Sequence, residues 1–135
     1  MGFRYANPPF AQPADSVEIT LDLPVPPSVN ETRKINHAAM GKLSAWRRAA
    51  DKLVIYQRMQ DRKNFRFIPG AFEARIVVNS TQERRDLDNF CKSILDYIVS
   101  LNLVHDDRGA FLRRLVVEWG EAPEGVRVTL KELPA

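Results

Sequence analysis

Cysteine is almost absent from this 135-residue chain, which contains Cys91 and no other. A single cysteine cannot form a disulfide within the chain, which fits a protein of a reducing compartment such as the cytosol. Long apolar runs are also missing, so no segment is expected to span a bilayer. The first sixteen residues, MGFRYANPPFAQPADS, lack the apolar stretch of a secretory signal. We therefore expect a cytoplasmic protein with no membrane partner.

The composition is that of an ordinary globular protein, with 44% hydrophobic and 27% charged residues. The net charge of +3 is unevenly distributed. Ten Lys or Arg stand against two Asp between Arg33 and Arg66, whereas the rest of the chain carries ten basic and fifteen acidic residues. A basic block on an otherwise acidic chain favours a polyanionic partner such as nucleic acid. A solvated basic helix explains the same block equally well.

Hydrophobic periodicity predicts one domain over residues 17–135, preceded by a flexible, proline-containing arm over residues 1–16. The predicted strands are 17–23, 72–78, 111–119 and 126–133, and the predicted helices are 44–60 and a second one from the Asp86 region to Asn102. The basic segment before residue 44 is expected to be a loop. The last two strands are expected to form a hairpin across GEAPEG (120–125). The order β-α-β-α-β-β predicts an α+β fold with a mixed sheet packed by two helices.

The densest charged motif of the chain is RRDLDNFCK, residues 84–92, and VHDD follows at 104–107. Taken singly, each acidic residue has a structural explanation. Asp86 suits a helix N-cap, Asp88 suits the first turn and has an i, i+4 spacing to Lys92, and the acidic pair at 106–107 suits a turn. These explanations are adequate for each residue alone.

The combination favours chemistry. If the strands before and after the second helix pair, the acidic pairs can face each other, and the convergent carboxylates would repel unless a cation neutralised them. Oxygen ligands suit Mg²⁺ or Mn²⁺. Lys92 could then hold a scissile phosphate, and Arg84 and Arg85 its neighbours. The pattern therefore predicts a metal-dependent phosphodiester hydrolase, although an isolated D-x-D also occurs in glycosyltransferases and phosphatases.

Three segments together resemble the RusA family of Holliday-junction resolvases over residues 17–133: LPVPPSVN (23–30), RRDLDNFCK (84–92) and SILDYIVSLNLVHDD (93–107). The resemblance implies a RusA-like fold and a homodimer, in which two-fold symmetry provides two sites for two cuts. It further implies a Mg²⁺-dependent endodeoxyribonuclease that makes paired symmetric nicks in four-way DNA junctions, with Mn²⁺ as a possible substitute. Such an enzyme would act at the nucleoid of a bacterial or prophage host.

The resemblance also implies roles for individual residues. The catalytic residues would be Asp86, Asp88, Lys92 and Asp107; the three aspartates would bind the metal, and Asp106 could assist as a further ligand. Asn89 and Asn30 would support the site, Asp96 would belong to helix packing, and His105 would be a packing or surface residue. The residues expected to contact DNA phosphates are Arg84, Arg85, Arg33, Lys34, Lys42, Arg47 and Arg48. Glu83 interrupts the arginine run that precedes D-L-D in the family, which bears on DNA affinity or junction preference.

Three other functions are compatible with the same sequence. The first is a related metal-dependent nuclease that acts on other branched or flapped DNA. The second is a DNA-binding relative that does not cleave. The presence of all four residues needed for the chemistry argues against it. The third is a D-x-D sugar-nucleotide transferase, which the lack of a nucleotide-binding signature disfavours.

Overall fold

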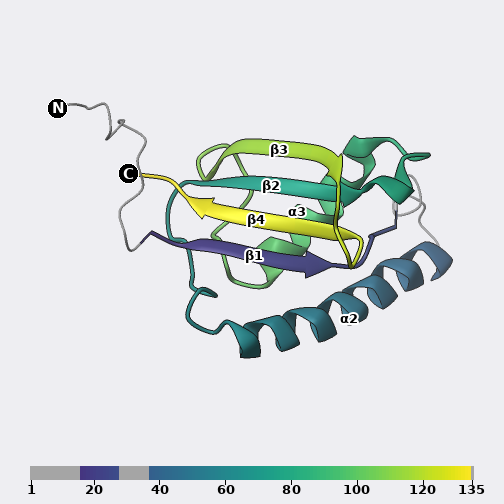
Figure 1. Ribbon diagram of the computed structural model, residues 1–135, viewed down its shortest axis with the longest axis horizontal. Coiled ribbons are helices and arrows are strands. Elements are labelled where there is room, and N and C mark those ends of the chain that lie inside the picture. Colours follow the sequence, from purple (N-terminus) through teal and green to yellow (C-terminus); the bar gives the residue numbers. More distant parts are fainter. Residues whose placement is uncertain (1–15, 28–36, 135) are drawn as a thin grey trace.

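The computed structural model describes residues 16–27 and 37–134. Their elements are β1 (Glu18–Leu23), α2 (His37–Gln60), β2 (Phe72–Asn79), the 3-10 helices η1 (Ser80–Gln82) and η2 (Leu87–Phe90), α3 (Cys91–Ser100), β3 (Leu112–Gly120) and β4 (Val126–Glu132) (Figure 1). The predicted α+β class and the predicted order of strands and α-helices are confirmed. None of the helices in the described part of the chain combines the length and the hydrophobicity needed to cross a bilayer.

The four strands form one mixed sheet in the order β1-β4-β2-β3. β4 runs antiparallel to both of its neighbours, and β3 runs parallel to β2. The predicted hairpin between β3 and β4 is therefore wrong, because β2 lies between them. The connection crosses the end of β2, where the backbone N–H of Asn79 donates to Gly125 O and its side-chain amide donates to Ala122 O, both at 2.9 Å.

β4 carries a row of fully buried residues, Val126, Val128 and Leu130, on the core face of the sheet. The tight approach of the connection to the end of β1 needs a glycine. Gly125 has φ +125°, and a Cβ there would lie 2.6 Å from a methyl group of Val25.

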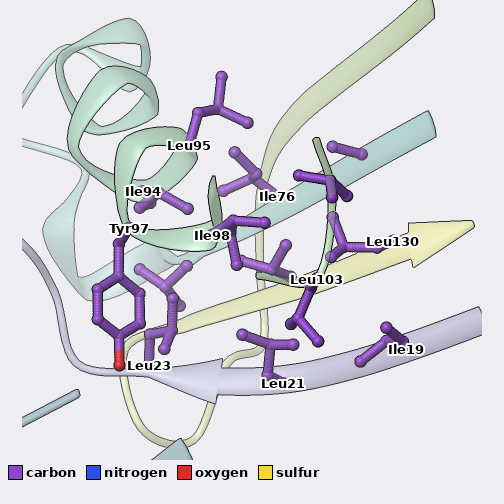
Figure 2. Close-up of a cluster of buried hydrophobic side chains, with 14 of the residues drawn as sticks. Ile19, Leu21, Leu23, Ile76, Ile94, Leu95, Tyr97, Ile98, Leu103 and Leu130 are labelled. Atoms are coloured by element: carbon purple, nitrogen blue, oxygen red, sulfur yellow. The ribbon is translucent and has the colours of Figure 1, made fainter. Parts of the chain in front are cut away.

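The hydrophobic core lies on one face of the sheet, between the strands and α3 (Figure 2). The labelled side chains come from β1, β2, β4, α3 and the segment after α3: Ile19, Leu21, Leu23, Ile76, Leu130, Ile94, Leu95, Tyr97, Ile98 and Leu103. The strand alternation predicted for 17–23 is confirmed, because every second residue from Val17 onward is buried. α2 joins this layer through the Trp46 ring, whose centroid lies 5.2 Å from that of Tyr97 in an edge-to-face contact.

Both helices differ from the prediction at their N-terminal ends. α2 begins at His37, so part of the segment that was expected to be a loop is helical. The apolar stripe of this helix begins only at Leu43, so hydrophobic periodicity could not mark the earlier turns. The second helix starts as the 3-10 helix η2 and becomes an α-helix only at Cys91. It stops as predicted at Asn102, which has the left-handed φ of 59° typical of a helix end.

Candidate functional site

The segment between β2 and α3 carries the first acidic pair. Asp86 precedes η2 with extended backbone angles, φ −74° and ψ 134°, but its side chain makes no capping hydrogen bond. The N-cap interpretation of its carboxylate is therefore wrong, although the position is that of an N-cap. Asp86 and Asp88 are both exposed. Asn89 closes the turn by donating its backbone N–H to Asp86 O at 3.0 Å. The two carboxylates thus stand at the surface on a short, hydrogen-bonded turn.

The arginine pair before these carboxylates divides into two environments. Arg85 donates through Nη1 to Pro26 O at 3.3 Å, and its guanidinium carbon lies 5.4 Å from the centre of the Phe90 ring. Phe90 is fully buried and meets Trp119 of β3 edge-to-face at 6.3 Å. Arg85 therefore fastens the acidic segment to the exit of β1, a structural role beyond the phosphate contact predicted for it. Arg84 is exposed.

Lys92, in the first turn of α3, contacts two carboxylates. Its Nζ lies 2.9 Å from Oδ1 of Asp96 and 3.5 Å from Oδ2 of Asp107. The i, i+4 partner is Asp96 and not Asp88, because Asp88 sits in a 3-10 turn with about three residues per turn and does not share an α-helical face with Lys92. The assignment of Asp96 to helix packing is also wrong, since its side chain is 45% exposed and ion-paired.

The electrostatics of this cluster fix the charge of Lys92. The hydrogen bond to Asp96 contributes most to raising the pKa of Lys92, followed by the charges of Asp96 and Asp107. A lysine whose pKa is raised stays protonated throughout the neutral range. Its side chain is 67% exposed, so it remains accessible to an anion from solution. Lys92 is therefore suited to bind a phosphate as a cation, and not to act as a general base.

The second acidic pair lies in the turn before β3 and its two members differ. Asp106 uses its carboxylate locally, accepting from the backbone N–H of Asp107 at 2.8 Å and lying 3.7 Å from Nε of Arg108. Asp107 is the more sheltered, with its side chain 19% exposed. It is Asp107 whose carboxylate reaches Lys92. Asp106 shapes the turn that presents Asp107.

The neighbouring His105 was predicted to be a packing or surface residue, and it is exposed while its ring contacts two aromatic side chains. Its ring lies 5.2 Å from that of Phe67 in an edge-to-face contact and 5.3 Å from that of Phe111. Aromatic contacts of this kind stabilise the turn before β3. The histidine therefore belongs to the packing of the turn.

β2 and β3 do pair, and because the pairing is parallel the two acidic pairs adjoin opposite ends of these strands. In a parallel pair the two C-terminal ends lie together, here Asn79 beside Gly120, and the two N-terminal ends lie together at the other end. The segment with Asp86 follows one end, and the turn with Asp107 precedes the other. α3 connects them, and Lys92 in its first turn contacts Asp107 of the second segment.

The fit of the site to a metal ion follows from this topology. Within residues 16–27 and 37–134, no group of three or more His, Cys, Asp or Glu side chains is placed to hold a metal ion. The oxygen chemistry of the aspartates suits Mg²⁺, but their arrangement does not fit a bound ion in this conformation. The predicted metal site is therefore not preformed in the described part of the chain.

Three of the predicted DNA contacts outside the motif lie on α2. Lys42 and Arg48 are exposed on α2, and Arg47 is half-buried there. α2 packs along β1, which forms the sheet edge farthest from β3 (Figure 1). The remaining predicted residues, Asn30, Arg33 and Lys34, lie outside the described residues, as does nearly all of the predicted N-terminal arm.

Cys91 stands beside the site but is not a nucleophile in it. Its side chain is half-buried, and burial raises the pKa of its thiol, with a smaller contribution from the negative charge of Asp88. A thiol with a raised pKa is protonated and unreactive at neutral pH.

Asp96 is the residue of the Lys92 cluster that the sequence interpretation assigned wrongly. Its ion pair with Lys92 could have been predicted from the spacing of four residues within the same predicted helix.

Comparison of the chain with known proteins gives no match from which the role of the site could be inferred. No family model matches the chain, and no curated protein matches it.

Proposed function

We propose that this chain is a RusA-like, Mg²⁺-dependent endodeoxyribonuclease that resolves four-way DNA junctions as a homodimer, by paired symmetric nicks. The observation that carries the proposal is the position of Lys92. Its ammonium group lies 3.5 Å from Asp107, four residues after the exposed Asp88 and six after the exposed Asp86. A cation flanked by carboxylates from two chain segments can bind a phosphate and stabilise the negative charge that develops on it during hydrolysis.

Lys92 would act on the scissile phosphate. Its short contact to Asp96, at 2.9 Å, holds the ammonium group in place, whereas its longer contact to Asp107, at 3.5 Å, is the one that a phosphate oxygen can replace. The ammonium group then neutralises the negative charge that builds up on the phosphate during bond breaking. The exposed Arg84 is placed in the chain to bind an adjacent phosphate, which positions the DNA without reading its sequence.

The proposed requirement for Mg²⁺ rests on the resemblance to the RusA family. Because the aspartates do not converge in the described chain, binding an ion requires the Asp86 segment and the Asp107 turn to approach each other, or a ligand from outside the described residues. An ion that brings carboxylates together relieves their repulsion and stabilises the bound form. Metal binding is therefore expected to change the thermal stability of the protein as well as its activity.

A second candidate function is that of a DNA-binding relative that does not cleave. The observation that favours it is the absence, among the described residues, of three acidic side chains placed to hold a metal ion. Such a protein would keep the exposed basic residues of α2 and bind junctions with or without Mg²⁺. A nuclease for flapped or other branched DNA remains the alternative within the nuclease class.

Cleavage of labelled substrates separates these functions. The protein is incubated with four-way junction, linear duplex and flap DNA, each with and without Mg²⁺. We expect symmetric nicks in the junction alone, and only when Mg²⁺ is present. Equal cutting of flaps would favour the broader nuclease, and tight junction binding without cutting under any metal condition would favour the non-cleaving relative.

A further inference from the structure

The outer edge of β3 is an unpaired strand edge in the described structure. β3 is the last strand of the sheet and pairs only with β2 among the described strands (Figure 1). It is nine residues long, contains no proline, and has no fully buried residue, in contrast to β2 and β4, where alternate residues are buried. Leu115 in its middle is 42% exposed. A long edge strand whose backbone has no described partner on one side is a template for another strand.

The opposite edge of the same sheet is closed. On β1, the backbone N–H of Asp22 donates to Oε1 of Gln57 at 2.7 Å, and Nε2 of Gln57 donates back to Asp22 O at 2.8 Å. The amide side chain from α2 thus makes the pair of hydrogen bonds that a neighbouring strand would make. Strand addition at β1 would have to displace this helix contact, so β3 is the edge at which the sheet can grow.

We propose that β3 pairs antiparallel with β3 of a second copy of this chain, about a two-fold axis at Val116. The sequence of the strand, LRRLVVEWG, is complementary to itself in this register. Arg114 faces Glu118 of the second copy, Arg113 faces Trp119, and Leu115 faces Val117. Each of these cross-strand contacts occurs twice because of the two-fold symmetry. The sheets of the two copies then form one continuous sheet. Opposite charges, a cation over an aromatic ring and apolar pairs are the cross-strand contacts that stabilise sheets.

The charges already present on the strand support this register. Arg114 lies 3.6 Å from Glu73, and Glu118 lies 3.1 Å from Arg75, both on the face of the sheet away from the core. Bringing Arg114 beside Glu118 of a second copy joins these two pairs into a row of alternating sign across the interface. A parallel pairing of the two strands in register would instead place Arg114 beside Arg114 and Glu118 beside Glu118. Like charges directly opposite each other destabilise a sheet.

The proposed interface is also connected to the candidate site. A two-fold axis between antiparallel strands stands perpendicular to the sheet, so the core face and α3 of both copies lie on the same side. Trp119 of β3 contacts Phe90 of η2, the turn that carries Asp88. The inference rests on the dimer of the proposed function, whose two sites this arrangement would present on one face. It does not depend on the cleavage reaction.

The experiment measures molar mass in solution by sedimentation equilibrium, without DNA. We expect the wild-type chain to be a dimer, and Arg114→Glu and Glu118→Arg each to weaken self-association by roughly tenfold or more, because each places like charges opposite each other twice. Mixing the two variants in equal amounts should restore a heterodimer, since both of its cross-strand pairs are again of opposite sign. The intrachain partners of both residues are unchanged by mixing, so a folding defect cannot mimic this rescue.

A cysteine placed on the two-fold axis provides a second measurement. Val116→Cys should form an intermolecular disulfide on mild oxidation, because directly opposed residues of antiparallel strands have Cα atoms about 4.5–5.5 Å apart. Leu112→Cys is the matched control on the same strand, since it faces Gly120 of the second copy and should not cross-link. The wild-type chain, with Cys91 alone, controls for the native thiol.

Several outcomes would overturn the inference. These are a monomeric wild-type chain, self-association that neither charge variant weakens, a mixture that stays monomeric, and equal cross-linking at residues 116 and 112. Loss of the dimer in Ile55→Glu with retention in both β3 variants would assign the interface to α2, where Met40, Ile55, Tyr56 and Met59 are exposed. Junction cleavage by a monomeric wild-type chain would overturn the dimer while leaving the proposed reaction in place.

Discussion

The two edges of the sheet use their polar side chains in opposite ways. On the β1 side, Gln57 bonds to the strand backbone and Arg127 forms a bidentate contact with Asp22. The hydroxyl of Tyr97, a buried residue between the two helices, donates to Asp51 at 2.7 Å. On the β3 side, Asp86, Asp88 and Lys92 are all exposed, and the strand edge has no described partner.

Within this small domain, the groups that stabilise the fold are therefore distinct from the groups that are available to a ligand. Polar groups that satisfy each other across the fold contribute to the free energy of unfolding and have little left to offer a ligand. Exposed charges held on short, hydrogen-bonded turns contribute little to stability and remain available to a substrate. Substitutions of the mutually paired groups on the β1 side should therefore lower stability and preserve activity, whereas substitutions of the exposed charges near the start of α3 should lower activity and leave stability nearly unchanged.

The largest effect is expected from Asp88→Asn, which removes one charge and preserves the size of the side chain. If the proposed function is right, cleavage of a four-way junction should fall below detection, and any rise in melting temperature on adding Mg²⁺ should shrink. Junction binding should persist. The matched control is Asp22→Asn on the β1 side, which should cost up to about 1 kcal/mol of stability and leave cleavage unchanged. Cleavage near the wild-type rate by Asp88→Asn would remove this residue from the site.

The next largest effect is expected from Lys92→Met, which keeps the length of the side chain and deletes its charge. The rate of cleavage should fall on the order of 10²-fold or more, as for the loss of one transition-state donor, with an unchanged melting temperature. Single-turnover kinetics with enzyme in excess keep weaker binding from being read as slower chemistry. Lys52→Met on exposed α2 is the control and should cleave normally. A fall of only several-fold would return Lys92 to the role of a surface ion pair.

A moderate effect on stability is expected from Gln57→Leu. The substitution leaves the edge N–H and C=O of Asp22 without their partner, at a cost of about 1–3 kcal/mol in the free energy of unfolding. Urea denaturation measures the loss, and the cleavage rate should not change. Gln60→Leu, the same change at the exposed end of the same helix, should leave stability nearly unaltered. Equal stability of the two variants would contradict a stabilising contact between Gln57 and the edge of β1.

The smallest effect is expected from Arg48→Gln on α2. As a sequence-independent phosphate contact, Arg48 should add about one unit to the slope of log affinity against log salt concentration, so its loss should flatten the slope by that amount. Titrations of junction DNA at several salt concentrations give the slope. Arg62→Gln, at an exposed arginine that is not a predicted phosphate contact, serves as the control. An unchanged slope in Arg48→Gln would support the solvated basic helix.

Local features of the fold could be predicted from the sequence better than long-range ones. Alternation at Ile19, Leu21 and Leu23 predicted β1 because a strand with one buried face repeats every two residues. The stop at Asn102 followed from local backbone preference. The start of α2 could not be read, since its first turns bear no apolar stripe, and the 3-10 geometry around Asp88 could not be distinguished from a regular helix. That geometry decided which acid pairs with Lys92.

The order of strands and helices, and the kinds of charged side chain near the start of α3, could be predicted from the sequence. Both follow from local pattern, because periodicity and residue type act over a few neighbouring residues. The position of β4 between β1 and β2, the contact of Lys92 with Asp107 and the contact of Gln57 with the edge of β1 emerge only in the folded structure. These features depend on which surfaces bury each other best, and that choice is made by the whole core at once.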